Sequence, residues 1–307
     1  MANTKLHRIK TISEFHQLRQ LPEPEHPLIS VINLELLKPV FVGEDTILTL
    51  DFYWIALRHS SNVKARYGQQ FYDFNKGILS FMSPNQVFTI GSSSENELPE
   101  KSGWALLIHP DFIWNTSLAK SIKQYAFFDY AVNEALFLSE KEETILNGTI
   151  ENIRQEYYSK IDKFSKQIII THLENLLSYS DRFYNRQFIT REKSNHQVLE
   201  RLENLLSDYF NSDDLISIGL PTVQYIANTL NISPKYLGSL LKQLTGQSTQ
   251  QHIHEKLIEK AKEKLSTTDL SISEIAYELG FEHSQSFSKL FKTKTRLSPL
   301  EFRQSYN

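Results

Sequence analysis

The sequence predicts an α+β chain: a small antiparallel β-barrel with a pair of long helices, followed by an all-α domain of two helix-turn-helix units. Two observations predict this division. Residues 27–110 hold several short apolar or alternating runs separated by turn residues, as antiparallel strands do. Residues 219–306 contain the same pair of short helical patterns twice. At 307 residues and 40% hydrophobic content, the chain is long enough to form two domains with buried cores.

Residues 1–25 are mostly polar and predict an N-terminal arm. A short helix is expected over 11–21, and Pro22 and Pro24 then mark a linker. We favour packing of this arm on the surface of the following domain over an arm that reaches the C-terminal domain.

Residues 26–195 are expected to form one sensing or dimerisation domain. Its first half contains the runs 28–34, 47–57, 71–74, 77–81 and 104–108, with turn signals at 43–44, 75–77 and 84–85. The aromatic residues of these runs are expected mainly to fill the barrel core, although a small barrel can also leave part of its interior open to a ligand. The candidates for such an effector pocket are Phe52, Trp54, Phe71, Phe74, Phe81 and Trp104.

The same region lacks the residues of a metal-dependent enzyme. Such a barrel needs two histidines at i and i+2 on a strand, a nearby Glu and a later His that converge on one ion. The region offers only His59, His26 and His109, and we interpret His109 as a capping or structural residue. The His-x-His at 252–254 falls on a predicted helix, where i and i+2 face different ways. The chain has no Cys. We therefore expect no metal, no cofactor and no enzymatic activity.

After Pro110 the pattern becomes helical. Ser139 begins a capped helix that extends to 158, with Ile145, Ile150, Ile153 and Tyr157 on its apolar side. A second helix is expected over 163–183. The basic and aromatic residues within 182–193 indicate a solvated loop at the domain boundary rather than a nucleic-acid patch. A connecting helix (196–210) and a hinge (211–219) then lead to the last domain, 220–307.

The first helical hairpin begins at Thr222, the N-cap of a short amphipathic helix that ends near Asn231. Ser233 caps the second helix, Pro234 opens it and Gly246 ends it.

The second hairpin begins at Ser271 and Glu274, which form a capping-box pattern, and its first helix ends at Gly280. The first helices of the two copies are offset by 49 residues and the second helices by 50, so the turn of the second copy has one extra residue. A helix over 250–265 links the two copies.

A helical hairpin binds DNA when its second helix presents polar and basic side chains away from the core. Gln, Ser, His and Lys can hydrogen-bond base edges, and Lys also neutralises phosphate. The residues predicted to be exposed and to contact double-stranded DNA are Lys235, Tyr236, Gly238, Ser239 and Lys242 in the first copy, and His283, Ser284, Gln285, Ser286, Ser288, Lys289 and Lys292 in the second.

The predicted helices of this region contain five longer sequence motifs. They are ISPKYL at 232–237, LIEKAK at 257–262, IAYELGF at 275–281, SFSKLFK at 286–292 and LSP at 297–299. Together with Phe302 and Arg303 they closely resemble the C-terminal domain of AraC/XylS-type transcription regulators, over about the last 90 residues. One position departs from the pattern: Arg296 stands where the family usually has Gly. Either the turn there relaxes, or Arg296 adds a phosphate contact.

The resemblance implies a sequence-specific transcription regulator whose two recognition helices enter major-groove segments about 34 Å apart. It implies base contacts from His283, Ser284, Gln285, Ser288 and Lys289, and from Lys235, Gly238 and Ser239, with Lys242 and Lys292 on phosphate. Residues 72–74, 84–86 and 103–104 resemble the cupin-like region that precedes this domain in many such regulators. Similar regulators dimerise through a helical pair, which implies a homodimer; packing of the pair within one subunit is the alternative. A small-molecule effector and RNA polymerase are further candidate partners.

The charge distribution agrees with a DNA-binding C-terminal domain. The whole chain has a net charge of −3, but residues 220–307 contain 11 Lys and Arg against 8 Asp and Glu. So modest an excess predicts weak, salt-sensitive non-specific binding. No apolar run approaches a membrane span and the first residues contain no signal-peptide core, so we expect a cytoplasmic protein.

These observations predict a DNA-binding regulator tuned by an effector or by dimerisation through the N-terminal domain. The alternatives are a constitutive DNA-binding protein whose barrel only dimerises it, and a cupin-type enzyme with a helical appendage.

Overall fold

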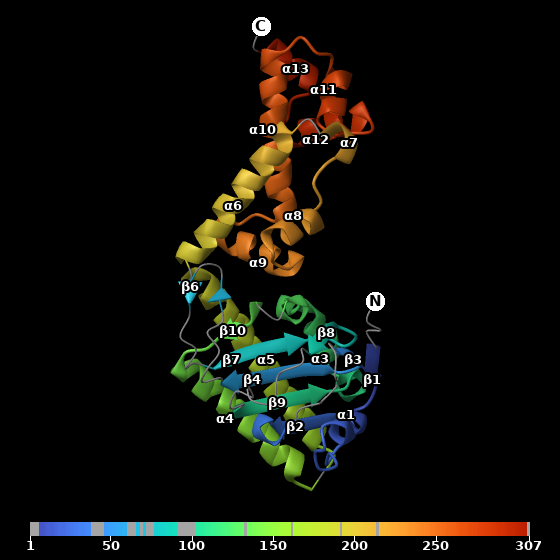
Figure 1. Cartoon of the computed structure of the whole chain (residues 1–307), viewed down its shortest axis with the longest axis vertical. Helices are drawn as coiled ribbons and strands as arrows, with labels where there is room; N and C mark the ends of the chain where they lie inside the picture. The colour runs from blue at the N-terminus through green and yellow to red at the C-terminus, as the bar shows by residue number, and fades with distance from the viewer. Residues whose placement is uncertain are drawn as a thin grey trace. The chain divides into compact units, whose positions relative to one another are not determined.

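The structure is a computed structural model that describes residues 6–37, 46–59, 66–67, 70–71, 77–90, 102–131, 134–160, 162–190, 192–212 and 215–305. The chain forms two compact units, Met1–Thr190 and Arg191–Asn307 (Figure 1). Among the described residues, no helix combines the length and the apolar character that a membrane crossing requires.

The strands of the N-terminal unit form sheets of five, three and two strands. The five-stranded sheet has the order β10-β7-β4-β9-β2, the three-stranded sheet β1-β3-β8, and β5 pairs with β6. Only β1 and β3 pair in parallel among these. The strands are β1 (Leu6–Ile9), β2 (Ile29–Asn33), β3 (Thr46–Leu50), β4 (Tyr53–His59), β5 (Arg66–Tyr67), β6 (Gln70–Phe71), β7 (Ile78–Met82), β8 (Val87–Ile90), β9 (Ser102–Ile108) and β10 (Leu136–Phe137).

The described strands form no closed barrel, so the structure does not confirm the cupin-like barrel; the α+β class holds. The predicted single run 47–57 is divided at Asp51 and Phe52, between β3 in one sheet and β4 in the other. The periodicity of a continuous apolar run is the same whether the chain stays in one sheet or changes to another. The sequence pattern therefore could not predict the change of sheet. Within the described residues, β2 and β10 remain the outer strands of the five-stranded sheet.

The N-terminal segment packs within its own unit, as the favoured interpretation has it. Helix α1 (Ile12–Leu18) begins after Thr11, whose hydroxyl accepts the N–H of Glu14. Ile12 and Phe15 are buried in a core with Phe52 and Trp54, and the Phe15 ring lies 5.5 Å from the Trp54 ring. This core lies on one side of the five-stranded sheet.

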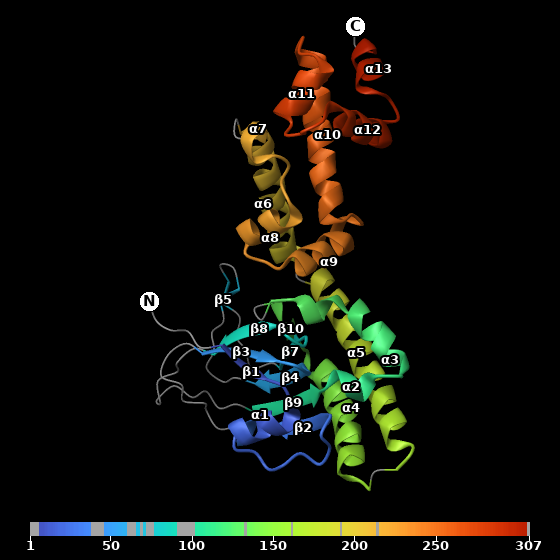
Figure 2. The ribbon, with the colours of Figure 1, turned by 90° about the vertical axis from the view of Figure 1, so that its right-hand side faces the viewer.

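Two long helices, α4 (Glu140–Tyr158) and α5 (Ser165–Thr190), cover the other side of that sheet (Figure 2). Ser139 and Glu142 form the predicted capping box of α4, and Ile150 and Ile153 are buried. Ile145, expected on the same apolar side, is 39% exposed. The buried face of α4 therefore packs within the same chain. Short helices α2 (Pro110–Ile113) and α3 (Ser117–Ser121) precede it, and 3-10 turns cover Leu34–Leu36, Ile122–Gln124 and Ala126–Asp129.

The predicted solvated loop at 182–193 is wrong, because α5 continues to Thr190. Tyr184 and Phe188 are each only 3% exposed, and the guanidinium of Arg186 donates to both carboxylate oxygens of Glu142 at 2.6 and 2.9 Å. The aromatic residues belong to a packed helix face, and Arg186 ties α5 to the start of α4.

The C-terminal unit consists of eight helices in its described part: α6 (Glu192–Asn211), α7 (Leu215–Ile218), α8 (Val223–Leu230), α9 (Pro234–Thr245), α10 (Thr249–Thr267), α11 (Ile272–Glu278), α12 (Ser284–Thr295) and α13 (Pro299–Gln304). One apolar core joins them. α10 contributes residues from Ile253 to Leu265, and both helical hairpins pack against it. The predicted connecting helix and hinge correspond to α6 and α7, which bury Leu202, Leu206, Phe210 and Leu215 in this same core.

Candidate nucleic-acid interface

The pairs α8–α9 and α11–α12 form two helix-turn-helix units with the same turn geometry. Asn231 has φ 58° and Gly280 has φ 80°, so both first helices are followed by a left-handed residue. In each turn a backbone N–H reaches back five residues: Ile232 donates to Ala227, and Phe281 to Ala276, both at 3.0 Å. The repeat seen in the sequence is therefore a repeat in three dimensions.

The extra residue of the second turn lies immediately before α12. Helices α8 and α11 begin 49 residues apart, whereas α9 and α12 begin 50 residues apart. The Ser233 hydroxyl accepts the N–H of Tyr236 at 3.2 Å and so caps α9. At the corresponding position His283 makes no such bond, and its side chain is exposed. The imidazole of His283 is therefore not used in capping.

The candidate contact residues occupy the same stripe on both second helices. On α9 the stripe contains Lys235, Gly238, Ser239 and Lys242; on α12 it contains Gln285, Ser288, Lys289 and Lys292. Residues at i, i+3, i+4 and i+7 share one helix face. The buried residues Leu237, Leu241, Phe287 and Phe291 lie on the opposite side, in the core. The two helices thus present equivalent polar faces, with Ser284 and Ser286 at the start of α12.

One predicted contact residue has a different environment. Tyr236 was expected to be exposed, but its side chain is only 2% exposed. It lies next to Leu237 at the core side of α9, whereas Ser286 at the equivalent place on α12 is exposed. A large aromatic side chain in this position contributes to packing, because its ring has apolar surface to bury. The expected exposure of Tyr236 is therefore wrong.

Positive charge collects on the two second helices. Neither α9 nor α12 contains an Asp or Glu, while together they contain Lys235, Lys242, Lys289, Lys292 and Lys294. Lys242 and Lys289 are exposed and form no ion pair with any described residue. On α10, by contrast, Lys256 and Lys260 pair with Glu259 and Glu263 at 3.0 and 2.9 Å. The unpaired lysines favour a polyanion at the stripe.

Lys294 was not among the predicted contact residues. Burial, and after it the charge of Lys294, lowers the pKa of His254 on α10. Lys294 therefore lies near the start of α10, off the stripe. In the sequence, Lys294 is recognisable only as a basic residue in the last turn of a predicted helix. That position is explained equally well by stabilisation of the helix, so it does not indicate the proximity of Lys294 to α10.

The turn after α12 does not relax around Arg296. Arg296 has φ 67° and ψ 0°, almost the same as Gly246 after α9, with φ 75° and ψ 0°. A side chain in this left-handed conformation is strained by about 1 kcal/mol or more. Arg296 is also exposed, four residues beyond Lys292.

We predict that Arg296→Gly raises the free energy of unfolding of the C-terminal unit by about 1 kcal/mol, because it removes this strain. The opposite change at the equivalent position of the first hairpin, Gly246→Ala, should lower the free energy of unfolding by a similar amount. Denaturant titration of the full chain measures both. Arg296→Ala keeps the strain and removes only the charge, so weaker DNA binding by both Arg296 variants would identify a phosphate contact. Equal stability of wild type and Arg296→Gly would contradict the strain argument.

The predicted effector-pocket residues do not form one cluster. Cross-strand partners share a face and neighbours along a strand alternate. Trp54 on β4 therefore faces the α1 side with Phe52, while Trp104, paired with Leu57, faces α4 and donates its indole N–H to Asn147 at 2.8 Å. Phe81 packs against Phe127 on that same helical side. The side chain of Phe71 and all of Phe74 lie outside the described residues.

Several of the described histidines have structural partners. His59 lies 2.8 Å from Glu143, and His109 caps α2 by accepting the N–H of Asp111, as predicted. His252 bonds to Thr245 and His254 to Gln250, so the two helical histidines do face different ways. Within the part of the chain that the structure describes, no three His, Asp or Glu side chains are placed to share a metal ion.

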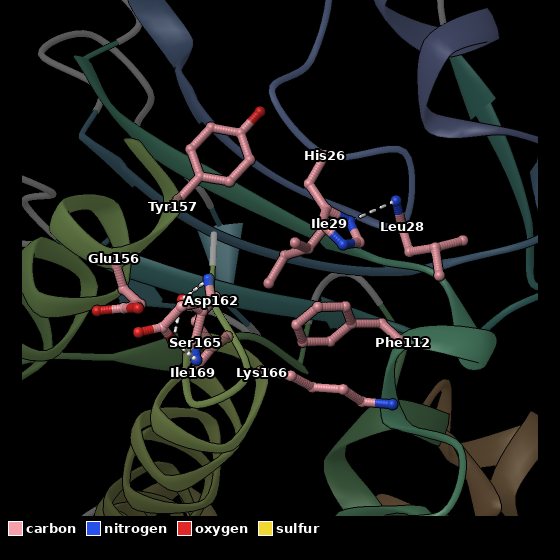
Figure 3. A pocket seen from close by; sticks show the side chains of 10 residues that line it. All are labelled: His26, Leu28, Ile29, Phe112, Glu156, Tyr157, Asp162, Ser165, Lys166 and Ile169. Atoms are coloured by element: carbon pink, nitrogen blue, oxygen red, sulfur yellow. Dashed lines mark hydrogen bonds between the residues drawn. The ribbon is translucent and has the colours of Figure 1, made fainter. Parts of the chain in front are cut away.

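A pocket of about 120 Å³ lies beside β2 and the α4–α5 turn (Figure 3). His26 accepts the N–H of Leu28 at 3.0 Å, Asp162 accepts the N–H groups of Phe164 and Ser165 at the start of α5, and Lys166 donates to the carbonyl of Trp114. These polar side chains already have partners, so the pocket offers few groups to a ligand.

Comparison with known proteins points to the C-terminal unit. Residues 226–305 match the family model of a helix-turn-helix domain. The uncharacterized HTH-type transcriptional regulator YijO of Escherichia coli is 29% identical over 133 residues, which are 43% of this chain and 44% of the relative. The HTH-type transcriptional activator RhaS of an Enterobacter species is 32% identical over 112 residues, 36% of this chain and 38% of the relative. The solved C-terminal domain of AraT, a response regulator from Geobacillus stearothermophilus, is 31% identical, with a TM-score of 0.31, over 35% of this chain and 84% of that domain. The chain spans less than half the length of the curated relatives it matches.

Proposed function

We propose, on the premise that residues 226–305 are an AraC-type helix-turn-helix domain, that this chain is a sequence-specific DNA-binding regulator of transcription. The observation that carries the proposal is the repeated stripe: two second helices, packed on the shared helix α10, present equivalent polar and basic faces. Two such helices held in a fixed relation suit successive segments of the major groove.

The residues of the stripe divide into two roles. Gln285, Ser288, Lys289, Lys235 and Ser239 have side chains that can hydrogen-bond base edges. Gly238 has open space around it, since an added Cβ would meet no atom within 4 Å, and so allows close approach of DNA. Lys242 and Lys292, at the far end of each stripe, would neutralise phosphate. His283 and Ser284 precede the stripe at the start of α12.

The first experiment is selection of genomic DNA fragments on the purified full-length chain at roughly 0.15 M salt, where non-specific binding is weak. We expect a shared motif with two half-elements about one helical turn apart. A variant with Gln285 and Lys289 both changed to Ala is the matched control and should lose the second half-element. Recovery of random fragments by wild type and variant alike would contradict the proposal.

We predict that Lys292→Ala weakens binding to specific and random DNA by the same factor. The loss of one phosphate contact should lower the slope of log K against log salt by about one unit. Binding titrations at several salt concentrations measure this slope. Lys260→Ala is the control, because Lys260 is paired with Glu263 on α10 and lies outside the stripe. A sequence-dependent loss for Lys292→Ala would place this residue on a base instead.

The N-terminal unit supplies the regulation in this proposal. An effector or a second copy of the chain bound there would change how two DNA-binding units are arranged. The 191–307 unit has its own core, which supports its use as an isolated fragment. Identical binding of a selected site by the fragment and by the full chain would eliminate this regulatory role and favour a DNA-binding protein that acts constitutively.

A further inference from the structure

The outer strand β2 has a free edge in the described part of the N-terminal unit (Figure 1). Its pairing with β9 fixes which backbone groups point to that edge. The N–H of His109 donates to the carbonyl of Leu28 at 2.8 Å, so Leu28 and every second residue after it hydrogen-bond to β9. Val31 and Asn33 lie between these residues and direct their N–H groups away from β9. Within the described residues, neither N–H group has an acceptor, and the carbonyl of Val31 has no donor.

A groove of about 320 Å³ lies along this edge. It is lined by residues of β2, by the segment 21–25 that follows α1, and by the last turns of α4; Val31 and Asn33 are both among the lining residues. It shares only Tyr157 with the pocket of Figure 3. Sites for small ligands have volumes of about 300–1,000 Å³, so the groove is large enough for a small ligand or a short stretch of extended chain.

The segment beside the groove cannot pair with β2 as a strand would. Pro22 and Pro24 have no N–H, and the N–H of Glu25 donates to the Tyr157 hydroxyl at 2.7 Å. Within 22–25 only the N–H of Glu23 remains. Proteins usually cover or blunt the edge of a sheet, but this segment lacks the donors to do so. The edge therefore stays unpaired, with space beside it for another chain.

The groove presents negative charge and apolar surface to an occupant. Glu23 and Glu25 line it, are exposed and form no ion pair with a described residue. Among the described lining residues Arg154 is the only Lys or Arg, and it already pairs with a neighbouring glutamate on α4 at 3.1 Å. Leu36 and Tyr158 also line the groove and are 58% and 60% exposed. An occupant that carries a cation and apolar side chains complements both features.

We propose that the groove binds an extended segment of a basic polypeptide, which adds a strand to the edge of β2. Carbonyl groups of the segment accept the N–H groups of Val31 and Asn33, and one of its N–H groups donates to the carbonyl of Val31. A Lys or Arg side chain of the segment meets the carboxylates of Glu23 and Glu25. The site belongs to the N-terminal unit alone, so it does not depend on the proposed DNA binding.

Two other occupants fit the groove less well. A small organic cation without a peptide backbone would leave the edge of β2 unpaired. A second copy of this chain, paired edge to edge, would bring the unpaired carboxylates of both copies to one interface, where like charges repel.

Binding of a blocked tripeptide to the full chain tests the site. The probe is acetyl-leucyl-lysyl-leucinamide, titrated at constant ionic strength. At ten times its Kd it should raise the thermal midpoint of the N-terminal unit by roughly 3–6 °C. Hydrogen exchange, read by NMR, should slow at the amides of Val31 and Asn33. The same peptide with N-methylated amides cannot donate from its main chain and should bind about three- to tenfold more weakly.

Three outcomes would overturn the proposal. The first is the absence of any shift with the lysyl tripeptide up to its solubility limit. The second is an equal affinity of the N-methylated peptide, or an equal effect of butylamine, which carries the charge without the backbone. The third is a dimer of the full chain in sedimentation that Asn33→Pro dissociates, because a second copy would then be the occupant.

Asn33→Pro tests the strand edge. Asn33 has φ −79°, which suits proline, and its N–H is not used within the described residues, so the fold should tolerate the change. Peptide affinity should fall about three- to tenfold, the loss expected for one hydrogen bond. Asn33→Ala loses the same side-chain bond to the N–H of Glu35 but keeps its own N–H, and should bind as wild type does. Equal affinities of these two variants would contradict strand pairing.

The double variant Glu23→Gln with Glu25→Gln tests the charge. It should bind the lysyl tripeptide about two- to fivefold more weakly, because both carboxylates are exposed, and should bind the uncharged norleucyl analogue as wild type does. Glu200→Gln changes an exposed glutamate of α6 and is the matched control. Unchanged affinity of the double variant for the lysyl tripeptide would overturn the assignment of a basic occupant.

Discussion

Phe287→Ala should lower the free energy of unfolding of the C-terminal unit by about 3–5 kcal/mol, the usual loss for a fully buried Phe. Phe287 is 0% exposed and its ring lies 5.5 Å from that of Phe281 and 5.8 Å from that of Phe291. It anchors α12 to the core that also contains α10 and α11. A cavity at this point would leave the polar stripe of α12 without the packing that supports it.

Denaturant unfolding of the full chain, followed by circular dichroism, measures this loss as a shift of one of two transitions. Ser286→Ala changes the preceding residue, which is exposed, and should shift the transition by less than about 0.5 kcal/mol. DNA binding of Phe287→Ala should be lost at temperatures where that of wild type persists. A loss below about 1 kcal/mol would mean that Phe287 does not hold α12 in place.

Gln285→Ala should weaken binding to the preferred DNA site by about 1–3 kcal/mol, a factor of roughly 5 to 150. Gln285 is exposed at the first position of the α12 stripe and has both a donor and an acceptor to offer a base edge. Because the change removes no charge, binding to random DNA should stay the same. Preference at one base position of the site should relax.

Competition binding against a set of single-base variants of the selected site separates these effects. Gln304→Ala, an exposed Gln on α13, is the matched control and should leave every affinity unchanged. Equal losses of Gln285→Ala on specific and random DNA would show that Gln285 stabilises the helix or contacts phosphate, and would end its assignment as a base-reading residue.

Much of the candidate interface was predictable because its signals are local. Caps, left-handed residues and apolar spacing lie within a few residues of each other, so the bounds of α8, α9, α11 and α12 agree closely with the predicted hairpins. The 49- and 50-residue offsets located the extra turn residue before α12. The predicted exposure of Tyr236 was wrong because this residue lies at the edge of the polar stripe. Its position on the helix does not decide whether a large side chain there packs against the core or faces solvent.

The N-terminal unit was less predictable because its contacts are long-range. The sequence indicated strands at 28–34, 77–81 and 104–108, close to β2, β7 and β9. The periodicity of a strand does not predict which strands it pairs with, so the order of strands in the sheet could not be derived from it. Phe52 and Trp54 are separated from Phe81 and Trp104 by the sheet itself, although all four read as one aromatic cluster.

The sequence by itself determined the repeated helical hairpins, their polar stripes and the capped long helices, because hydrogen bonds and side chains within one or two helical turns decide these features. The tertiary structure alone decided which sheet each strand joins, which face each aromatic side chain takes and how α1 meets β4. Those outcomes depend on burying apolar surface between segments far apart in the chain, and the free energy of such packing is set by the partners together rather than by either segment.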